Sequence, residues 1–104
     1  MVIDHRQLVT AALIEDSERR VLVGKRPTRS KHGGLWEFPG GKVNEGEAPP
    51  DCLRRELREE LQVRVEVGEP YARIRSDLAI ELLVFRASLV SGTPRALDHD
   101  EIQW

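Results

Sequence analysis

The sequence of 104 residues predicts an α+β fold, or an α/β sandwich with a mixed sheet. Several short segments are rich in β-branched and apolar residues, which is typical of strands. One segment, 50–61, repeats leucine every four residues, which is typical of a helix that packs on one face. Strand-like segments lie on both sides of this single helix, and this arrangement indicates the fold class. We expect one domain over residues 1–104, because a chain of this length has no room for two.

The segments before the helix alternate between strand-like and loop-like composition. Apolar, β-branched runs predict strands, whereas Pro, Ser and paired Gly predict loops. In order, we expect a strand at LVTAALI (8–14), a turn at EDSERR (15–20), a strand at VLVGKR (21–26), a loop at PTRSKHGG (27–34) and a short strand at LWEFP (35–39) that runs into Gly40-Gly41.

The helix is expected to begin after Pro49-Pro50 and to extend to about Leu61. At 100° per residue, Leu53, Leu57 and Leu61 fall on one side and form the stripe that packs on the sheet. Beyond the helix we expect strands at VRVEV (63–67), YARIRS (71–76) and AIELLVFRASL (79–89), the last two forming a hairpin that turns near Ser76-Asp77, and then a loop and one more short strand within RALDHDEIQW (95–104).

Composition indicates an ordinary soluble globular protein, with 39% hydrophobic and 33% charged residues. No apolar run approaches the ~18 residues that a membrane span needs, and residues 1–14 lack the pattern of a signal peptide. The single cysteine, Cys52, has no partner for an internal disulfide. We therefore expect a cytoplasmic protein without a membrane partner. The net charge of −2 argues against binding of a nucleic-acid polymer over the whole surface.

Charge is unevenly distributed along the chain. Residues 19–36 contain six Lys or Arg and no acid, whereas the helix carries a dense group of carboxylates. A basic strand and loop beside an acidic helix suits a small, highly charged anion that binds together with metal ions. The alternative is that both segments are simply solvated faces, which is the usual meaning of charge runs.

Three helix acids, Glu56, Glu59 and Glu60, share one ~100° sector beside the leucine stripe. Two of them lie in the last turn, where the helix already carries partial negative charge, and like charges four residues apart repel. A cation would offset this repulsion, and Mg²⁺ or Mn²⁺ prefers such oxygen ligands. The preceding Gly40-Gly41 pair allows the backbone to approach a ligand closely and to offer a carbonyl or an N–H group.

These residues carry a family resemblance. Gly41, Glu47 and the run RELREELQV (55–63) resemble the Nudix box G-x5-E-x7-R-E-U-x-E-E-x-G-U, where U is apolar, over residues 41–63; Gln62 stands in place of the last glycine. The flanking stretches GKRP (24–27) and GLWEFPGGK (34–42) resemble the MutT-type branch, which acts on nucleoside triphosphates.

The resemblance implies an α/β/α sandwich around a mixed sheet and an enzyme that hydrolyses phosphoric anhydrides. Water would attack the β-phosphorus of a nucleoside triphosphate and release a nucleoside monophosphate and pyrophosphate, with Mg²⁺ as cofactor and Mn²⁺ as substitute. The substrate would be 8-oxo-dGTP or a pyrimidine (d)NTP, and the protein a monomer or a homodimer. The alternative is a non-catalytic Nudix module that senses nucleotides or recognises a damaged base. Such modules typically lose the metal-binding glutamates, which this chain retains.

The resemblance also implies roles for individual residues. Glu56, Glu59 and Glu60 would be the catalytic metal ligands, assisted by the Gly40 carbonyl, and Glu59 would also position or deprotonate the water. Asp98 would be an additional acidic ligand or base, with Asp100 and Glu101 as neighbouring contenders, or merely a turn residue. Glu47 and Arg55 would pair and hold the loop to the helix. The expected substrate-binding residues are Arg26, Lys31, Glu37, Phe38, Pro39, Gly41 and Lys42.

Several of these residues have plainer interpretations. Arg26 could be a surface arginine at a strand end, and Phe38 could belong to the core. We expect Trp36 to anchor the core, and His5, His32 and His99 to be exposed or hydrogen-bonded. Cys52 is expected to permit close packing.

The sequence departs from the family pattern at three places. Gln62 replaces a glycine that would end the helix in the left-handed conformation, at a cost of up to ~1 kcal/mol. Ala48 stands where a Ser or Thr cap is common, which weakens the helix start by ~1 kcal/mol. MutT-like proteins continue past the position of Trp104 into a second helix. We expect that helix to be absent from these 104 residues and one sheet face to be exposed, which favours dimerisation or partial disorder.

Overall fold

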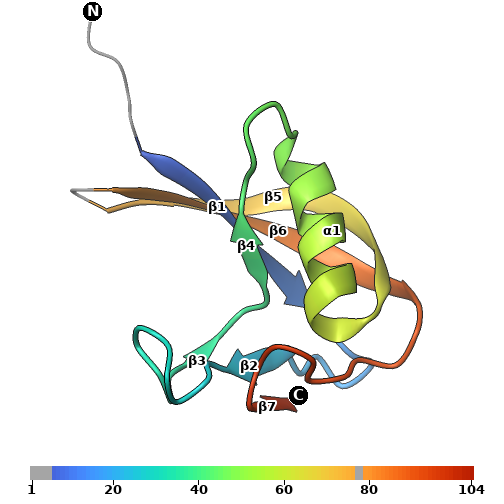
Figure 1. Cartoon of the computed structure of the whole chain (residues 1–104). Helices are drawn as coiled ribbons and strands as arrows, with labels where there is room; N and C mark the ends of the chain where they lie inside the picture. Colours follow the sequence, from blue (N-terminus) through green and yellow to red (C-terminus); the bar gives the residue numbers. More distant parts are fainter. Residues whose placement is uncertain (1–5, 77–78) are drawn as a thin grey trace, which may run out of the picture.

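The computed structural model describes residues 6–76 and 79–104, and it has the predicted α+β architecture with a mixed sheet (Figure 1). Within these residues there is one helix, and no helix is long and apolar enough to span a bilayer. In chain order the elements are β1 (Gln7–Ile14), β2 (Val23–Lys25), β3 (Trp36–Glu37), β4 (Gly40–Lys42), α1 (Pro49–Leu61), β5 (Arg64–Arg75), β6 (Ile80–Ser91) and β7 (Glu101–Gln103).

The strands form two sheets. The larger has the order β4-β1-β6-β5, in which β1 and β6 are parallel and the other two pairs are antiparallel. The smaller has the order β3-β2-β7 and is antiparallel throughout. Figure 1 shows α1 lying across the larger sheet, with the smaller sheet beyond the end of the helix. The last strand, β7, pairs with β2, so residues 101–103 lie beside residues 23–25.

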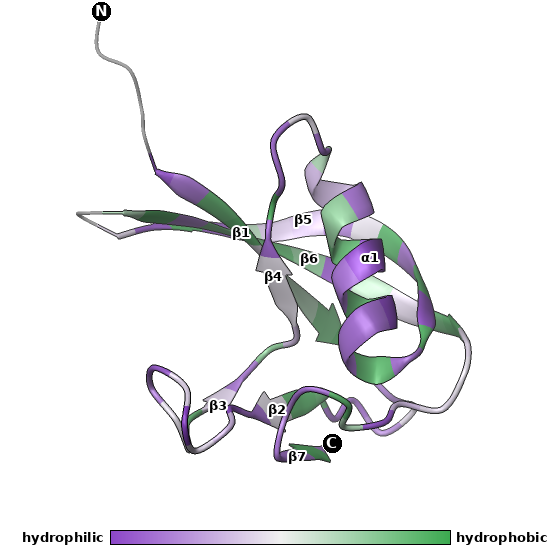
Figure 2. Cartoon of the chain, in the orientation of Figure 1, coloured by the Kyte–Doolittle hydropathy of each residue, from purple (hydrophilic) through white to green (hydrophobic). Residues whose placement is uncertain are grey.

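The core lies between α1 and the larger sheet. Leu53, Leu57 and Leu61 are fully buried there, which confirms the predicted stripe. They pack in one cluster with Ile14 of β1 and Phe85 of β6. Figure 2 shows hydrophobic residues on the strands behind α1, while the helix carries both hydrophilic and hydrophobic residues around its circumference. Burial of the leucines thus fixes how α1 is turned, and its carboxylates follow from that orientation.

The opposite face of the larger sheet is partly exposed. Register places Ile74 of β5 opposite Leu82 of β6, which in turn pairs with Val9 of β1, on the side away from the helix. Ile74 is 56% exposed and Ile80 43% exposed. The expectation of an exposed sheet face is confirmed at this end of the sheet.

Two predicted strands, 63–67 and 71–76, form the single strand β5. Its ladder with β6 is irregular between Val67 and Ala72, around Gly68 and Pro70. Because β5 is an edge strand, the proline can occupy it without breaking a second ladder. The predicted hairpin with β6 is confirmed; Asp77, in its expected turn, lies outside the described residues.

The predicted strand 35–39 is present only as β3, and Gly40-Gly41, into which it was expected to run, begin a separate strand, β4, in the other sheet. Between them Pro39 is buried, and its carbonyl accepts a hydrogen bond from Ala12 N–H at 2.9 Å. The expectation that Trp36 anchors the core is wrong, since this side chain is 43% exposed. Successive residues of a strand face opposite ways. Glu37 faces inward to His99, so Trp36 faces outward.

Both helix ends lack the residues that usually stabilise them. Ala48 is the N-cap and provides no side-chain hydrogen bond. Gln62 adopts the left-handed conformation at φ 60° and ψ 39°, and its N–H donates to the Arg58 carbonyl at 3.0 Å. The backbone therefore keeps the geometry of the family glycine although a side chain is present, which costs about 1 kcal/mol.

We expect Gln62→Gly to stabilise the fold by about 1 kcal/mol, because glycine adopts this conformation without steric cost. For a domain of this size, that corresponds to a rise in the melting temperature of about 4 °C. Thermal unfolding followed by circular dichroism measures the change.

The matched control is Arg58→Gly, since Arg58 is exposed within the same helix. Glycine in a helix interior destabilises by about 1 kcal/mol, so the two variants should shift the melting temperature in opposite directions. A loss of stability in both would show that the strain at Gln62 is absent.

Candidate active site

The Gly40-Gly41 pair and the acidic side of α1 meet at one corner of the larger sheet. Gly40 N–H donates to Glu60 Oε2 at 3.2 Å. A Cβ added to Gly41 would lie 2.3 Å from the Glu56 carboxyl carbon, so only glycine allows this approach. The structure therefore brings β4 against two of the three predicted carboxylates.

Glu60 is the most buried carboxylate of this corner, at 8% exposure. Burial raises its pKa to about 8, and the nearby charges of Glu56 and Asp98 act in the same direction. The charge of His99 and the Gly40 N–H group lower it by less. The pKa of Glu56 is likewise raised, chiefly by burial. Burial therefore disfavours the charged form of both carboxylates, and a bound cation would stabilise that form.

Arg55 connects the loop before α1 to the helix acids. Its Nε and NH2 atoms donate to both carboxylate oxygens of Glu47 at 2.8 and 2.9 Å, which is a bidentate pair. NH1 donates to Glu56 Oε1 at 2.9 Å, and NH2 also donates to the Lys42 carbonyl at 3.2 Å. The hydrogen bonds from Arg55 lower the pKa of Glu47 to about 2. The pairing that the family resemblance implies is present in the structure.

Glu59 is more exposed than the other two acids and shares the Arg55 NH1 atom with Glu56. Its side chain is 60% exposed, and Oε2 is 3.3 Å from Arg55 NH1. The three glutamates share the predicted sector of the helix, yet only Glu56 and Glu60 reach the Gly40-Gly41 corner. The role of Glu59 as a ligand or as the group that positions water is still a prediction.

The donor set fits a hard divalent cation. Glu56, Glu60 and the backbone of β4 offer oxygen atoms, which Mg²⁺ and Mn²⁺ prefer. Among residues 6–76 and 79–104, no three His, Cys, Asp or Glu side chains form a ready-made metal cage. Mg²⁺ is commonly held by one or two carboxylates together with water and substrate phosphates, so such a cage is not required.

The predicted substrate residues lie on or near the smaller sheet and β4. Arg26 and Glu37 face each other at 2.9 Å, and Arg26 Nε also donates to the Lys31 carbonyl at 2.8 Å. Phe38 is 42% exposed, so its alternative place in the core is wrong. The Lys31 and Lys42 side chains are exposed, whereas Pro39 is buried and offers little surface to a ligand.

The acidic residues near the end of the chain fall into different places. Asp98 is exposed and lies close enough to Glu60 and His99 to influence the pKa of both. Asp100 instead accepts hydrogen bonds from the backbone and hydroxyl of Thr28 and fastens the loop 27–34. Of these contenders, Asp98 is the one near the glutamate corner.

His99 is the residue whose importance the sequence did not reveal. Its side chain is 2% exposed, and Nε2 is 3.0 Å from Glu37 Oε2. The hydrogen bond to Glu37 raises the pKa of His99 despite its burial. It was expected to be exposed or hydrogen-bonded, and the second alternative is confirmed. The spacing of the histidines in the sequence does not indicate this contact, because the contact joins two residues that are 62 positions apart.

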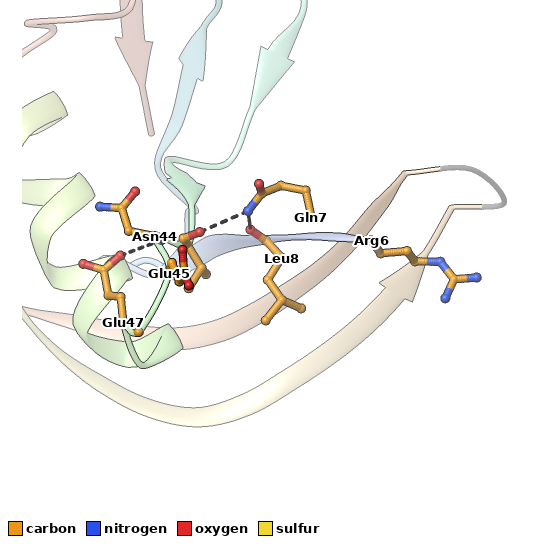
Figure 3. Close-up of a pocket in the computed structure, with 8 residues that line it drawn as sticks. Arg6, Gln7, Leu8, Asn44, Glu45 and Glu47 are labelled. Atoms are coloured by element: carbon orange, nitrogen blue, oxygen red, sulfur yellow. Dashed lines mark hydrogen bonds between the residues drawn. The ribbon is translucent and has the colours of Figure 1, made fainter. Parts of the chain in front are cut away.

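A separate pocket of about 430 Å³ opens at the other end of β4 (Figure 3). It is lined by the start of β1 and by the loop between β4 and α1, that is, by Arg6, Gln7, Leu8 and Val43 to Glu47. Within it Gln7 donates to the Val43 carbonyl at 3.1 Å. The pocket does not include Gly40, Glu56 or Glu60, so it is distinct from the glutamate corner.

Comparison with known proteins settles the family. The NUDIX domain family matches residues 5–104. The chain belongs to the Nudix family. Its relatives include the CTP pyrophosphohydrolase of Escherichia coli (strain K12), with 38% identity over 99 residues, and the 8-oxo-dGTP diphosphatase of Proteus vulgaris, with 42% identity over 65 residues. These matches cover 92% and 62% of this chain, and 73% and 58% of the two relatives.

Solved structures of Nudix proteins share this fold. The crystal structure of a MutT NUDIX hydrolase from Burkholderia pseudomallei matches 97% of this chain and 83% of its own, with a TM-score of 0.85 and 28% identity. The solution structure of the E. coli ORF135 protein matches 95% of this chain and 72% of its own, with a TM-score of 0.76 and 36% identity. The predicted resemblance to MutT-type Nudix hydrolases is confirmed.

Burial of Glu60 predicts a pH dependence of stability in the metal-free protein. Its pKa in the folded state, about 8, lies above the value of 4.5 expected when exposed. Between these values the folded protein binds a proton that the unfolded chain has released, so this contribution to stability is lost as the pH rises from about 4.5 to 8. Urea unfolding in EDTA should show wild type losing up to a few kcal/mol relative to Glu60→Gln over this range. A constant difference between the two proteins would contradict the burial of a costly carboxylate.

The bidentate pair between Arg55 and Glu47 predicts that the fold loses stability when the guanidinium group is removed. Arg55→Lys keeps the charge but cannot make the bidentate pair, so we expect a loss of about 1 to 2 kcal/mol in urea unfolding at pH 7. Arg54→Lys is the matched control, because Arg54 forms an exposed pair with Asp51 that should contribute less than about 1 kcal/mol. Equal losses in the two variants would show that the network adds nothing beyond a surface pair.

Proposed function

We propose that this chain is a Mg²⁺-dependent pyrophosphohydrolase that converts a nucleoside triphosphate to a nucleoside monophosphate and pyrophosphate. The observation that carries the proposal is the corner where Gly40 and Gly41 meet the buried carboxylates of Glu56 and Glu60. Two acids with raised pKa values, held against strand β4, suit a divalent cation that arrives with phosphates.

In the proposed reaction, bound Mg²⁺ would neutralise the triphosphate and lower the pKa of a coordinated water. Glu56, Glu60 and the Gly40 carbonyl would hold the ion. Glu59, being exposed beside them on the same helix, would position or deprotonate the water that attacks the β-phosphorus. Asp98 would supply a further acidic group from the C-terminal segment.

The opposite charge comes from the smaller sheet. Arg26 NH2 has no hydrogen-bond partner among the described residues, while Nε and NH1 are both engaged. A guanidinium fixed in this way suits a phosphate oxygen. The exposed Lys31 and Lys42 side chains and the ring of Phe38 would complete the surface around the substrate.

The names of the relatives indicate the substrate class. They include a CTP pyrophosphohydrolase and an 8-oxo-dGTP diphosphatase, so we propose 8-oxo-dGTP or a pyrimidine (d)NTP as substrate. The protein would act in the cytoplasm, as a monomer or homodimer, without binding nucleic-acid polymers or membranes.

Release of pyrophosphate from a nucleotide panel tests the proposal. The panel contains the NTPs and dNTPs, 8-oxo-dGTP, ADP-ribose and a dinucleoside polyphosphate, each with Mg²⁺, Mn²⁺ or EDTA. We expect metal-dependent release of pyrophosphate from one triphosphate class. In ¹⁸O-labelled water the label should enter pyrophosphate, because attack occurs at the β-phosphorus. Binding of Mn²⁺ and nucleotide without any turnover would favour a sensing module instead.

Glu59→Gln should lower kcat by about 10² to 10⁴, as expected for loss of a group that assists proton transfer, while the circular dichroism spectrum stays unchanged. The matched control is Glu66→Gln, an exposed glutamate on β5 that should keep full turnover. Full activity of the Glu59 variant would remove that residue from the mechanism.

A further inference from the structure

We propose that His99 is a positioning residue: it orients Glu37, which in turn holds the Arg26 guanidinium so that its NH2 atom is available to a phosphate oxygen. The inference rests on the proposed function in taking Arg26 as a phosphate ligand. It adds a buried residue, far from the Nudix box in sequence, to the parts that determine how the substrate is bound.

The contacts form a continuous chain. His99 Nε2 lies 3.0 Å from Glu37 Oε2, and Arg26 NH1 donates to the other oxygen, Oε1, at 2.9 Å. Arg26 Nε is fixed separately by the Lys31 carbonyl at 2.8 Å. Each oxygen of Glu37 therefore has a partner within the protein, and the carboxylate links His99 to Arg26.

The backbone around His99 is held from two sides. Two residues before it, Leu97 N–H donates to the Glu60 carbonyl at 3.1 Å, at the end of α1. One residue after it, Asp100 N–H donates to the Lys25 carbonyl at 3.0 Å, beside Arg26. His99 thus lies between the acidic helix end and the strand that leads into the arginine.

The smaller sheet provides space for the imidazole at Gly24. A Cβ at this position would be 2.5 Å from His99 Cδ2, so any side chain there would displace the ring. Gly24 is also the register partner of Glu37 in the ladder between β2 and β3. The ring therefore lies over a glycine whose neighbour across the ladder is the carboxylate that it contacts.

Packing alone does not explain a histidine here. His99 Nδ1 is buried and has no hydrogen-bond partner among the described residues. A buried polar atom without a partner is unfavourable, and a leucine would fill the space without it. The contact with Glu37 is what the imidazole adds, and it acts on the arginine through the shared carboxylate.

A double-mutant cycle tests the proposal, using wild type, His99→Leu, Arg26→Ala and the double variant. Two quantities are measured: KM and kcat for the nucleotide that wild type hydrolyses, and the Kd for inorganic tripolyphosphate by calorimetry, which needs no turnover. We expect His99→Leu to raise KM and Kd about five- to tenfold with kcat within about threefold, and Arg26→Ala to raise them about 10- to 100-fold. The double variant should equal Arg26→Ala, because His99 acts through Arg26.

Two further variants separate positioning from packing. His99→Gln retains an amide at about the place of Nε2 and should recover most of the affinity. Ile102→Ala loosens the same sheet at the residue that pairs with Gly24, but it removes none of the contacts that link His99, Glu37 and Arg26. It should therefore lower the melting temperature and leave KM and Kd unchanged. If His99→Leu fails to fold, Gly24→Ala displaces the ring from the same position and should reproduce its effect.

Unchanged KM and Kd in His99→Leu, or effects of the two substitutions that multiply, would overturn the inference. If wild type binds tripolyphosphate with this pattern but hydrolyses no nucleotide, the proposed function fails and the inference stands. If wild type neither binds tripolyphosphate nor hydrolyses a nucleotide, Arg26 is not a phosphate ligand and the inference is overturned.

Discussion

The close contact between α1 and β4 is the constraint on which the rest of this structure depends. Gly41 allows the Glu56 carboxylate to approach the strand, and Gly40 donates to Glu60. Both carboxylates are withdrawn from water by this contact, which is why their pKa values are raised. The leucine face of the helix supplies the packing that keeps them there, since Leu53, Leu57 and Leu61 are completely buried. The burial of the leucines therefore offsets the unfavourable burial of the Glu56 and Glu60 carboxylates.

Two basic side chains approach the acidic helix from different directions. Arg55, within the helix, binds Glu47 and Glu56 and so fastens the preceding loop. His99, from the C-terminal segment, lies near Glu60 and lowers its pKa. These contacts partly offset the repulsion among the helix acids. The charged form of Glu60 is still disfavoured by burial, and a bound cation would stabilise it.

The two sheets contribute different groups to the candidate site. The larger sheet and α1 provide carboxylates, whereas the smaller sheet presents Arg26 and its partner Glu37. The segment between β6 and β7 joins the two sides, because it hydrogen-bonds both to the end of α1 and to Lys25. The chain passes from the smaller to the larger sheet between β3 and β4, so Glu37 and Gly40 lie on different sides of the site although they are three residues apart.

Sequence alone determined the elements whose signals are local. The leucine spacing specified the helix and its buried face, and the Nudix box specified which acids share a sector of α1. Tertiary structure determined the strand pairing, side-chain orientation and burial that local sequence signals do not contain. It joined two expected strands into β5 because an edge strand tolerates Pro70, and it turned Trp36 outward because Glu37 faces inward. It also separated Glu59 from Glu60 by burial and brought His99 to Glu37. Such contacts join residues far apart in the chain, and their energies depend on burial, which only the packed structure sets.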